Sequence, residues 1–182
     1  SRAADIIELL KVKKQFGINL VLNGAQDAVV VKEKLAQAQV PVIISAMDSL
    51  PSSFDSLHAS LDNAAVLEKA GVKVILTVGG DASHNIYQLR FDAGNAVSYG
   101  MSQQGALNAV TSNVADVFGI NAGSLEVGKA ADVVVWSNDP FELSSHVSKM
   151  IINGEEVSTQ SRQDKLRERY TTDSTMPRAY TK

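Results

Sequence analysis

Three short apolar runs separated by helical patterns constrain the fold of this chain more than any other feature. The runs are residues 18–22, 42–45 and 72–78, and each has the length and composition of a buried strand. Helical patterns precede the first run and occupy residues 26–37, 57–70 and 87–99. Alternation of strands and helices is typical of βαβ units, so the sequence predicts an α/β fold with a parallel sheet.

A different pattern begins after Gly119. Glycines at positions 123 and 128 mark turns, and residues 132–136 and 147–152 read as two strands. The second strand ends in the dipeptide Asn153-Gly154, which favours a tight hairpin turn. This region is therefore predicted to be a small antiparallel unit. Residues 161–170 are highly charged and predict a short exposed helix, whereas the end of the chain lacks apolar periodicity and is expected to be extended or disordered.

Composition narrows the class of protein. Hydrophobic residues make up 45% of the chain, charged residues 20%, and the formal net charge is −3. These values are typical of a soluble globular protein, and the negative charge argues against nucleic acid as the main partner. No apolar run approaches the roughly 20 residues of a membrane helix. We therefore expect a soluble protein of the cytoplasm or periplasm. The absence of cysteine excludes disulfides and thiolate metal ligands.

Polar residues follow two of the predicted strands. Asp81 lies just after residues 72–78, and His84 and Asn85 follow in the same loop. The carboxyl ends of parallel strands are where such folds bind ligands, so Asp81 is a candidate catalytic residue, while His84 and Asn85 are candidate substrate contacts. The spacing alone equally fits an aspartate that caps the next helix or closes an Asx turn, and a polar loop with a helix N-cap.

Three further polar residues are weaker candidates. Asn23 follows the first predicted strand. Because an amide is a poor transition-metal ligand beside imidazole, we assign it to substrate contact and not to metal binding. His58 and His146 have neither a second histidine nor a carboxylate at ligand spacing, so we expect both to be surface or half-buried residues.

The order of residues in the second region carries a family resemblance. It reads Gly-Ser-Leu-Glu-x-Gly-Lys-x-Ala-Asp-x-Val-x-Trp over residues 123–136, followed by Asp139-Pro140 and a strand ending in Asn-Gly. This order resembles the C-terminal β segment of amidohydrolase-superfamily enzymes and is most similar to their imidazolonepropionase-related group. Gly80 departs from the family pattern, in which Thr or Ser usually precedes the aspartate.

The resemblance implies an architecture. The three predicted strands fall at the sixth, seventh and eighth strands of a (β/α)8, or TIM, barrel, so the chain is expected to be the C-terminal part of a larger enzyme. Residues 1–119 would form the last three or so βα units of this partial barrel. Residues 120–160 would form a segment of a small composite β-sandwich, and residues 161–182 a charged helix and tail.

The resemblance also implies an activity. Family members use a divalent metal, usually zinc, to activate water, and an aspartate at the position of Asp81 binds the metal and accepts the proton. The reaction would hydrolyse a non-peptide C–N bond, such as a cyclic amide, or a peptide-like bond in a small molecule. The family's His-x-His metal anchor is absent from this chain. We therefore expect the chain alone to be inactive and to assemble no metal site.

The expected partners and an alternative function follow from the same features. Exposed strands and helix faces predict association with the missing N-terminal half of the barrel or with a second copy of the chain. The alternative to the enzyme is a non-catalytic α/β binding or assembly module derived from such a barrel. That alternative predicts a stable fold that binds no metal.

Overall fold

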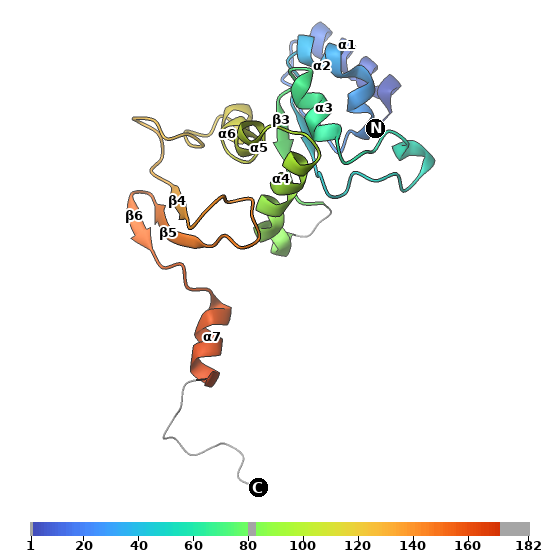
Figure 1. Cartoon of the computed structure of the whole chain (residues 1–182). Helices are drawn as coiled ribbons and strands as arrows, with labels where there is room; N and C mark the ends of the chain where they lie inside the picture. The colour runs from blue at the N-terminus through green and yellow to red at the C-terminus, as the bar shows by residue number, and fades with distance from the viewer. Residues whose placement is uncertain (1, 80–82, 172–182) are drawn as a thin grey trace.

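The structure is a computed structural model that describes residues 2–79 and 83–171. Within these residues the chain forms two three-stranded sheets, which lie in different parts of the molecule (Figure 1). Sheet A contains β1 Leu22–Asn23, β2 Val42–Ile44 and β3 Val74–Leu76 in the order β1-β2-β3. Both of its pairings are parallel, which confirms the parallel sheet predicted from the alternating pattern.

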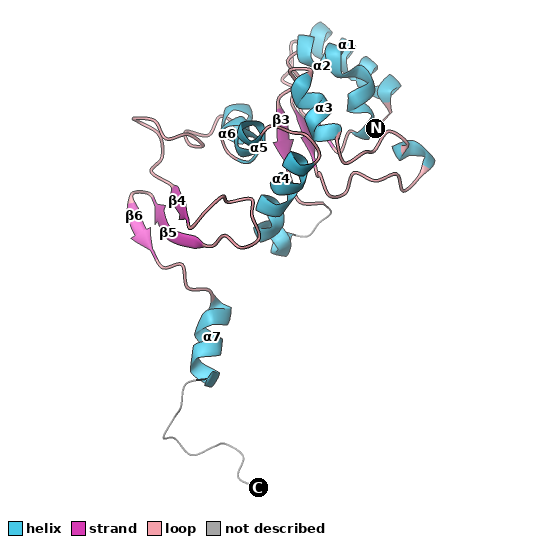
Figure 2. Ribbon diagram, in the orientation of Figure 1, coloured by secondary structure: helices cyan, strands magenta, loops and turns pink. Residues whose placement is uncertain are grey.

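Helices α1, α2 and α3 alternate with the strands of sheet A, and α4, α5 and α6 follow its last strand (Figure 2). Their bounds are α1 Ala3–Phe16, α2 Lys32–Gln37, α3 Asn63–Lys69, α4 Leu89–Ser98, α5 Gln103–Val110 and α6 Ser112–Phe118, with 3₁₀ segments η1 Gln26–Val31, η2 Phe54–Ser56 and η3 Ser83–Gln88. Local signals account for several of their ends. Gly17 ends α1 in the left-handed conformation, and the Ser102 hydroxyl caps α5 by accepting a hydrogen bond from the Gly105 N–H.

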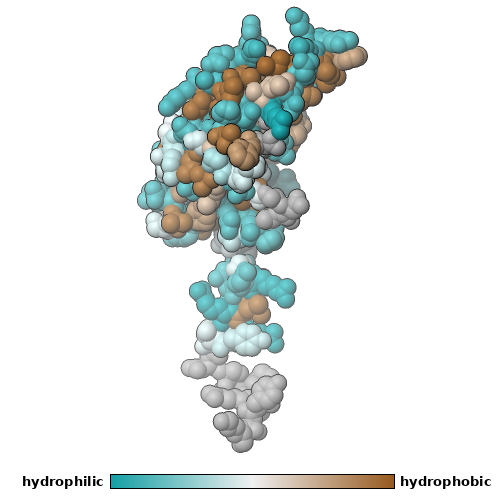
Figure 3. All heavy atoms as spheres, turned by 90° about the vertical axis from the view of Figure 1, so that its right-hand side faces the viewer, coloured by the Kyte–Doolittle hydropathy of each residue, from teal (hydrophilic) through white to brown (hydrophobic). Residues whose placement is uncertain are grey.

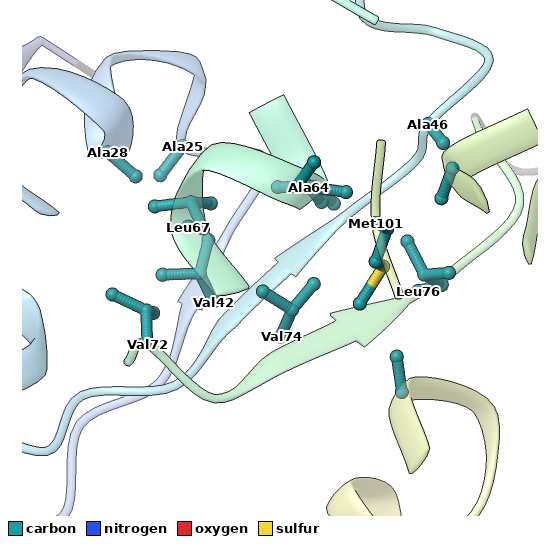
Figure 4. Packing of buried hydrophobic residues seen from close by; sticks show 14 of the residues in the cluster. Ala25, Ala28, Val42, Ala46, Ala64, Leu67, Val72, Val74, Leu76 and Met101 are labelled. Atoms are coloured by element: carbon teal, nitrogen blue, oxygen red, sulfur yellow. The ribbon is translucent and has the colours of Figure 1, made fainter. Parts of the chain in front are cut away.

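The two faces of sheet A differ. The register places Val42 opposite Leu22 and Val74, and Ile44 opposite Leu76. These five residues are all part of the buried hydrophobic cluster, into which the helices also pack (Figure 4). Side chains alternate between the faces of a strand, so the row Asn23, Ile43 and Ile75 points to the opposite face. There Ile75 is buried, Ile43 is half-buried and Asn23 is exposed.

Sheet B is antiparallel and more exposed. It consists of β4 Val133–Trp136, β5 Val147–Ile152 and β6 Glu155–Val157. No residue of its three strands is fully buried. Asn153 and Gly154 both have positive φ angles, of 52° and 83°, as a type I′ hairpin turn requires. The helix α7 Arg162–Thr171 follows and projects away from the rest of the described chain (Figure 1).

Element boundaries differ from the sequence predictions in several places, and β3 is shorter than the run at residues 72–78. The first strand, predicted at residues 18–22, is only Leu22–Asn23; it pairs only with β2 among the described residues, and Ile18 is 44% exposed. The helix predicted at residues 26–37 begins as the 3₁₀ segment η1 before α2. The helix predicted at residues 57–70 is only Asn63–Lys69, since residues 57–62, which include His58, form turns and irregular structure.

The connection between β2 and α3 carries exposed hydrophobic side chains. Met47, Leu50, Phe54 and Leu57 are between 54% and 92% exposed. Figure 3 shows hydrophobic residues interspersed with hydrophilic ones over the side of the molecule on which this connection lies. None of the helices in the described part of the chain has the length and apolar character needed to cross a membrane.

Candidate functional site

The candidate site is the edge of sheet A at which its three parallel strands end. Asn23 is the last residue of β1 and is exposed there. His84 and Asn85 lie in η3, between β3 and α4, where His84 is exposed and Asn85 is half-buried. β2 lies between β1 and β3, and neighbouring strands are about 5 Å apart. Asn23 is therefore separated from β3 by two strand spacings.

Asp81, the predicted metal ligand and catalytic base, lies outside the described residues. The chain on either side of it is described: Gly79 follows β3, and Ser83 begins η3. The assignment of Asp81 as a metal ligand and base therefore stays a prediction from the sequence.

The turn after β2 is built around a buried aspartate on α4. Asp92 is only 1% exposed. Its Oδ2 accepts a hydrogen bond from the Ala46 N–H at 2.9 Å, and its Oδ1 accepts from the Met47 N–H at 2.9 Å and the Ser45 hydroxyl at 3.1 Å. Burial raises the pKa of Asp92 above its usual value, although these hydrogen bonds act in the opposite direction. One carboxylate thus satisfies three polar groups at the end of a central strand.

The same turn presents a second aspartate. The Asp48 N–H donates to the Ser45 hydroxyl at 3.2 Å, and the Ser49 hydroxyl donates to the Ser45 carbonyl at 2.6 Å. The Asp48 side chain is exposed at the carboxyl-end edge. Its carboxylate lies directly against Gly79, so that a Cβ atom at that position would overlap with Oδ2. The ends of β2 and β3 are therefore in direct contact through Asp48.

A third aspartate connects the loop after β1 to two other elements. The Asp27 Oδ2 accepts from the Ala3 N–H at 2.9 Å, at the start of α1, and Oδ1 lies 2.9 Å from His58 Nδ1. Burial raises the pKa of Asp27, but the hydrogen bonds from His58 and Ala3 outweigh it and hold that pKa below its usual value. A hollow of about 390 Å³ lies beside this pair.

Sequence reasoning missed the roles of Asp92 and Asp27. The expectation that His58 lies on the surface agrees with its 55% side-chain exposure, but its carboxylate partner is 31 residues away in sequence. For Asp92 a signal was present: it lies on the same helix face as Ala96, four residues later, which is also buried. A charged residue on an apolar helix face is a reason to expect a specific partner.

The described residues do not fit a complete metal site. Within the described residues, 2–79 and 83–171, no three His, Cys, Asp or Glu side chains come close enough to one another to hold a metal ion. The three aspartates of this edge instead bond to backbone and side-chain groups of the chain itself or, in the case of Asp48, lie against Gly79. Any metal bound at this edge would need ligands from elsewhere.

Comparisons with known proteins agree with the architecture. The model of the Amidohydrolase family matches residues 3–157. A search of curated protein sequences found no match. Among solved structures, an amidohydrolase from Thermotoga maritima MSB8 is similar, with a TM-score of 0.77 and 30% identity. That alignment covers 86% of this chain and 41% of the other.

Two more distant structures share the fold. N-isopropylammelide isopropylaminohydrolase from Burkholderia multivorans ATCC 17616 aligns with a TM-score of 0.59 and 18% identity, over 82% of this chain and 42% of that one. An enamidase of the amidohydrolase superfamily aligns with a TM-score of 0.53 and 16% identity, over 78% of this chain and 41% of its own. The chain thus spans about two fifths of the length of the solved structures it matches.

Proposed function

Since the chain belongs to the amidohydrolase family, we propose that it is the C-terminal portion of a longer, metal-dependent hydrolase. The longer protein would hydrolyse a non-peptide C–N bond, in a cyclic amide or a small peptide-like molecule. The observation that carries the proposal is the family match over residues 3–157. The edge of sheet A supports it, because parallel strands of such folds bind ligands where they end.

We further propose that sheet A supplies the last three strands of a (β/α)8 barrel. Its strands are parallel, occur in sequence order and have two open edges among the described residues. Earlier strands of the longer protein would pair with those edges. Residues 1–119 would then be barrel, residues 120–160 would be part of a composite β-sandwich, and residues 161–182 a charged helix and tail.

The proposed roles of the site residues follow from the family and from their positions. Asp81 would bind the metal and act as the general base. Asn23, His84 and Asn85 would contact the substrate. Asn23 is exposed at the end of β1, on the sheet face opposite the helices, and His84 is exposed in η3; both positions are compatible with contact to a small molecule bound above the sheet edge.

The metal would be divalent, and zinc is the ion that the family resemblance implies. The described residues lack a ligand cluster, so Asp81 would be this chain's contribution and the remaining ligands would come from the rest of the longer protein. We therefore propose that the 182-residue chain by itself is inactive. We also propose that it associates with the missing portion or with a second copy, because sheet A has open edges and nearby apolar side chains are exposed.

A second candidate is a non-catalytic binding or assembly module derived from such a barrel. One observation favours it: the carboxyl end of β1 presents the amide of Asn23, where an imidazole would be a much better metal ligand. The two candidates differ in what the longer protein does, because the module binds no metal and hydrolyses nothing.

The test compares the longer protein with the 182-residue chain. Both are assayed for bound zinc by elemental analysis and for hydrolysis of a panel of cyclic amides, small N-acyl amines and dipeptides, before and after treatment with a chelator. The enzyme proposal predicts bound metal and chelator-sensitive hydrolysis in the longer protein only. A longer protein that is folded and free of metal, and that stays inactive when zinc is added, would contradict it and favour the module.

A further inference from the structure

The turn after β2 is held in an unusual way, by a carboxylate from another part of the fold. Asp92 lies on α4, and the three groups that donate to it belong to consecutive residues 45–47. Removing a carboxylate from water is unfavourable unless its oxygens accept hydrogen bonds. Both Asp92 oxygens do so, and the N–H groups of Ala46 and Met47 would otherwise lose their partner. The turn therefore has one conformation that suits Asp92.

That conformation determines where Asp48 lies. The Ser45 hydroxyl donates to Asp92 and accepts from the Asp48 N–H, so the backbone of Asp48 is two hydrogen bonds away from the buried carboxylate. The Asp48 side chain then extends over Gly79, at the end of the neighbouring strand. Gly79 has no Cβ, and the Asp48 carboxylate occupies the place where one would be.

The result is an exposed carboxylate between the ends of two parallel strands. Asp48 remains exposed although its backbone is hydrogen-bonded in the turn, so its oxygens are accessible from the edge at which the proposed substrate binds. A carboxylate accepts hydrogen bonds only. Its natural complement is a donor with a positive charge, such as an ammonium group on the nitrogen side of the C–N bond that is hydrolysed.

We propose that Asp48 is a substrate-contacting carboxylate that accepts a hydrogen bond from an ammonium group on the nitrogen side of the substrate, and that Asp92 is the positioning residue that holds it over Gly79. The inference rests on the proposed hydrolase function and deepens it, because it assigns the substrate's nitrogen side to the ends of β2 and β3.

The kinetic test uses two probes that differ in one group. N-acetylethylenediamine carries an ammonium where N-propylacetamide carries a methyl group, and both contain the same acetamide bond. The ratio of kcat/KM for the two probes in the longer protein measures recognition of the ammonium. Asp48→Asn should lower this ratio about tenfold, since a hydrogen bond to a charged group contributes on that scale. The change should appear as a higher KM for the ammonium probe.

Variants at the two supporting positions separate positioning from general damage. Asp92→Asn has nearly the same shape but replaces one acceptor oxygen with a donor, so the turn must shift. Gly79→Ala places a methyl group where the Asp48 carboxylate lies. Both should lower the same ratio, and the double variant Asp48→Asn/Asp92→Asn should lower it no further than Asp48→Asn alone. Asp116→Asn, an exposed aspartate on α6, is the control and should leave the ratio unchanged.

A second measurement does not depend on activity. In ¹⁵N NMR spectra of the 182-residue chain, Asp92→Asn should shift the amide signals of residues 45–49 and leave those of β5 in place. Unshifted signals would overturn the positioning role. If Asp92→Asn lowers kcat/KM equally for both probes, Asp92 has only a structural role. If Asp48→Asn leaves the ratio of kcat/KM for the two probes unchanged, the substrate contact is overturned while the hydrolase function stands. A longer protein that hydrolyses neither these probes nor the wider panel would overturn the substrate contact together with the hydrolase.

Discussion

The parallel and antiparallel parts of the chain are built on different principles. All three residues of β3 and two of the three in β2 are buried, and the helices around sheet A belong to the same hydrophobic cluster. In sheet B, by contrast, half or more of each strand is exposed. Sheet A therefore has its own core on one face, whereas sheet B in the described chain is a thin layer whose stability depends on what it is attached to.

The attachment includes specific contacts with α4. Arg90 donates to the carbonyl oxygens of Pro140 and Glu142, at 2.9 and 2.8 Å, and its guanidinium lies 5.2 Å from the ring centroid of Trp136. Phe141 packs against Gly94, where a Cβ would be only 2.9 Å from the Phe141 carbonyl oxygen. Because α4 also carries Asp92, one helix links the antiparallel unit to the turn after β2.

The largest expected difference is in the cost of truncating a hydrophobic side chain. Leu67 is 1% exposed in α3, and Leu67→Ala should lower the free energy of unfolding by about 2–5 kcal/mol. Ile152 in β5 is 45% exposed, and Ile152→Ala should cost about 1 kcal/mol or less. Urea unfolding of the 182-residue chain measures both values. Equal costs would mean that sheet B is packed as tightly as sheet A.

The next effect concerns Asp92. Asp92→Asn should lower the free energy of unfolding by about 2 kcal/mol, because buried donors lose an acceptor. The pKa of Asp92 is raised by burial above the ordinary value of 3.8, so the folded state holds this proton more tightly than the unfolded state. Its contribution is therefore fully present below pH 3.8 and decreases as the pH rises through the folded pKa. The difference in free energy of unfolding between the wild type and Asp92→Asn should become smaller as the pH rises through the folded pKa of Asp92. A difference that stays constant with pH would contradict the raised pKa of Asp92.

A smaller effect is expected at Arg90. Arg90→Met removes both hydrogen bonds to the loop before β5 but keeps much of the apolar stem, and should cost about 1–2 kcal/mol. The amides of β4 and β5 should then exchange hydrogen roughly 5 to 30 times faster, while those of β2 and β3 keep their rates. Arg162→Met in the exposed helix α7 is the matched control. Uniform acceleration in both sheets would show that Arg90 stabilises the whole chain and not the attachment.

The smallest effect concerns His58. Its side chain is 55% exposed, so His58→Gln should cost only about 0.2–1 kcal/mol. The pKa of Asp27 is held below 3.8 with His58 as one cause, so its contribution is present above that pH and is lost as the pH falls through the folded pKa. As the pH falls through this range, His58→Gln should therefore lose less free energy of unfolding than the wild type does. An acid transition identical to that of the wild type would contradict the role of the pair.

Sequence patterns predicted those parts of the fold that local signals determine. The strands β2 and β5 and the turn at Asn153-Gly154 each depend on residues close together in the chain, and all three were located. The first strand was predicted too long because burial on both sides was assumed, whereas β1 is at an edge. The contacts of Asp27 and Asp92 join residues 24 to 47 positions apart, and no local pattern reports such a distance.

The site was predicted less completely than the fold. The residues that the sequence singled out, Asn23, His84 and Asn85, lie at or after the ends of strands of sheet A. The position of Asp48 depends on a glycine 31 residues later and on a buried carboxylate of α4, and no local pattern in the sequence reports either. The roles of Asn23, His84 and Asn85, and that of Asp81, stay predictions.

The most direct test of the account replaces the proposed base in the longer protein. Asp81→Asn should lower kcat by about 100-fold or more, the scale of general acid–base catalysis, in a protein whose circular dichroism spectrum is unchanged. Asp116→Asn, an exposed aspartate of α6, should keep wild-type activity. If Asp81→Asn keeps full activity, the end of β3 is not the catalytic edge and the proposed hydrolase site is wrong.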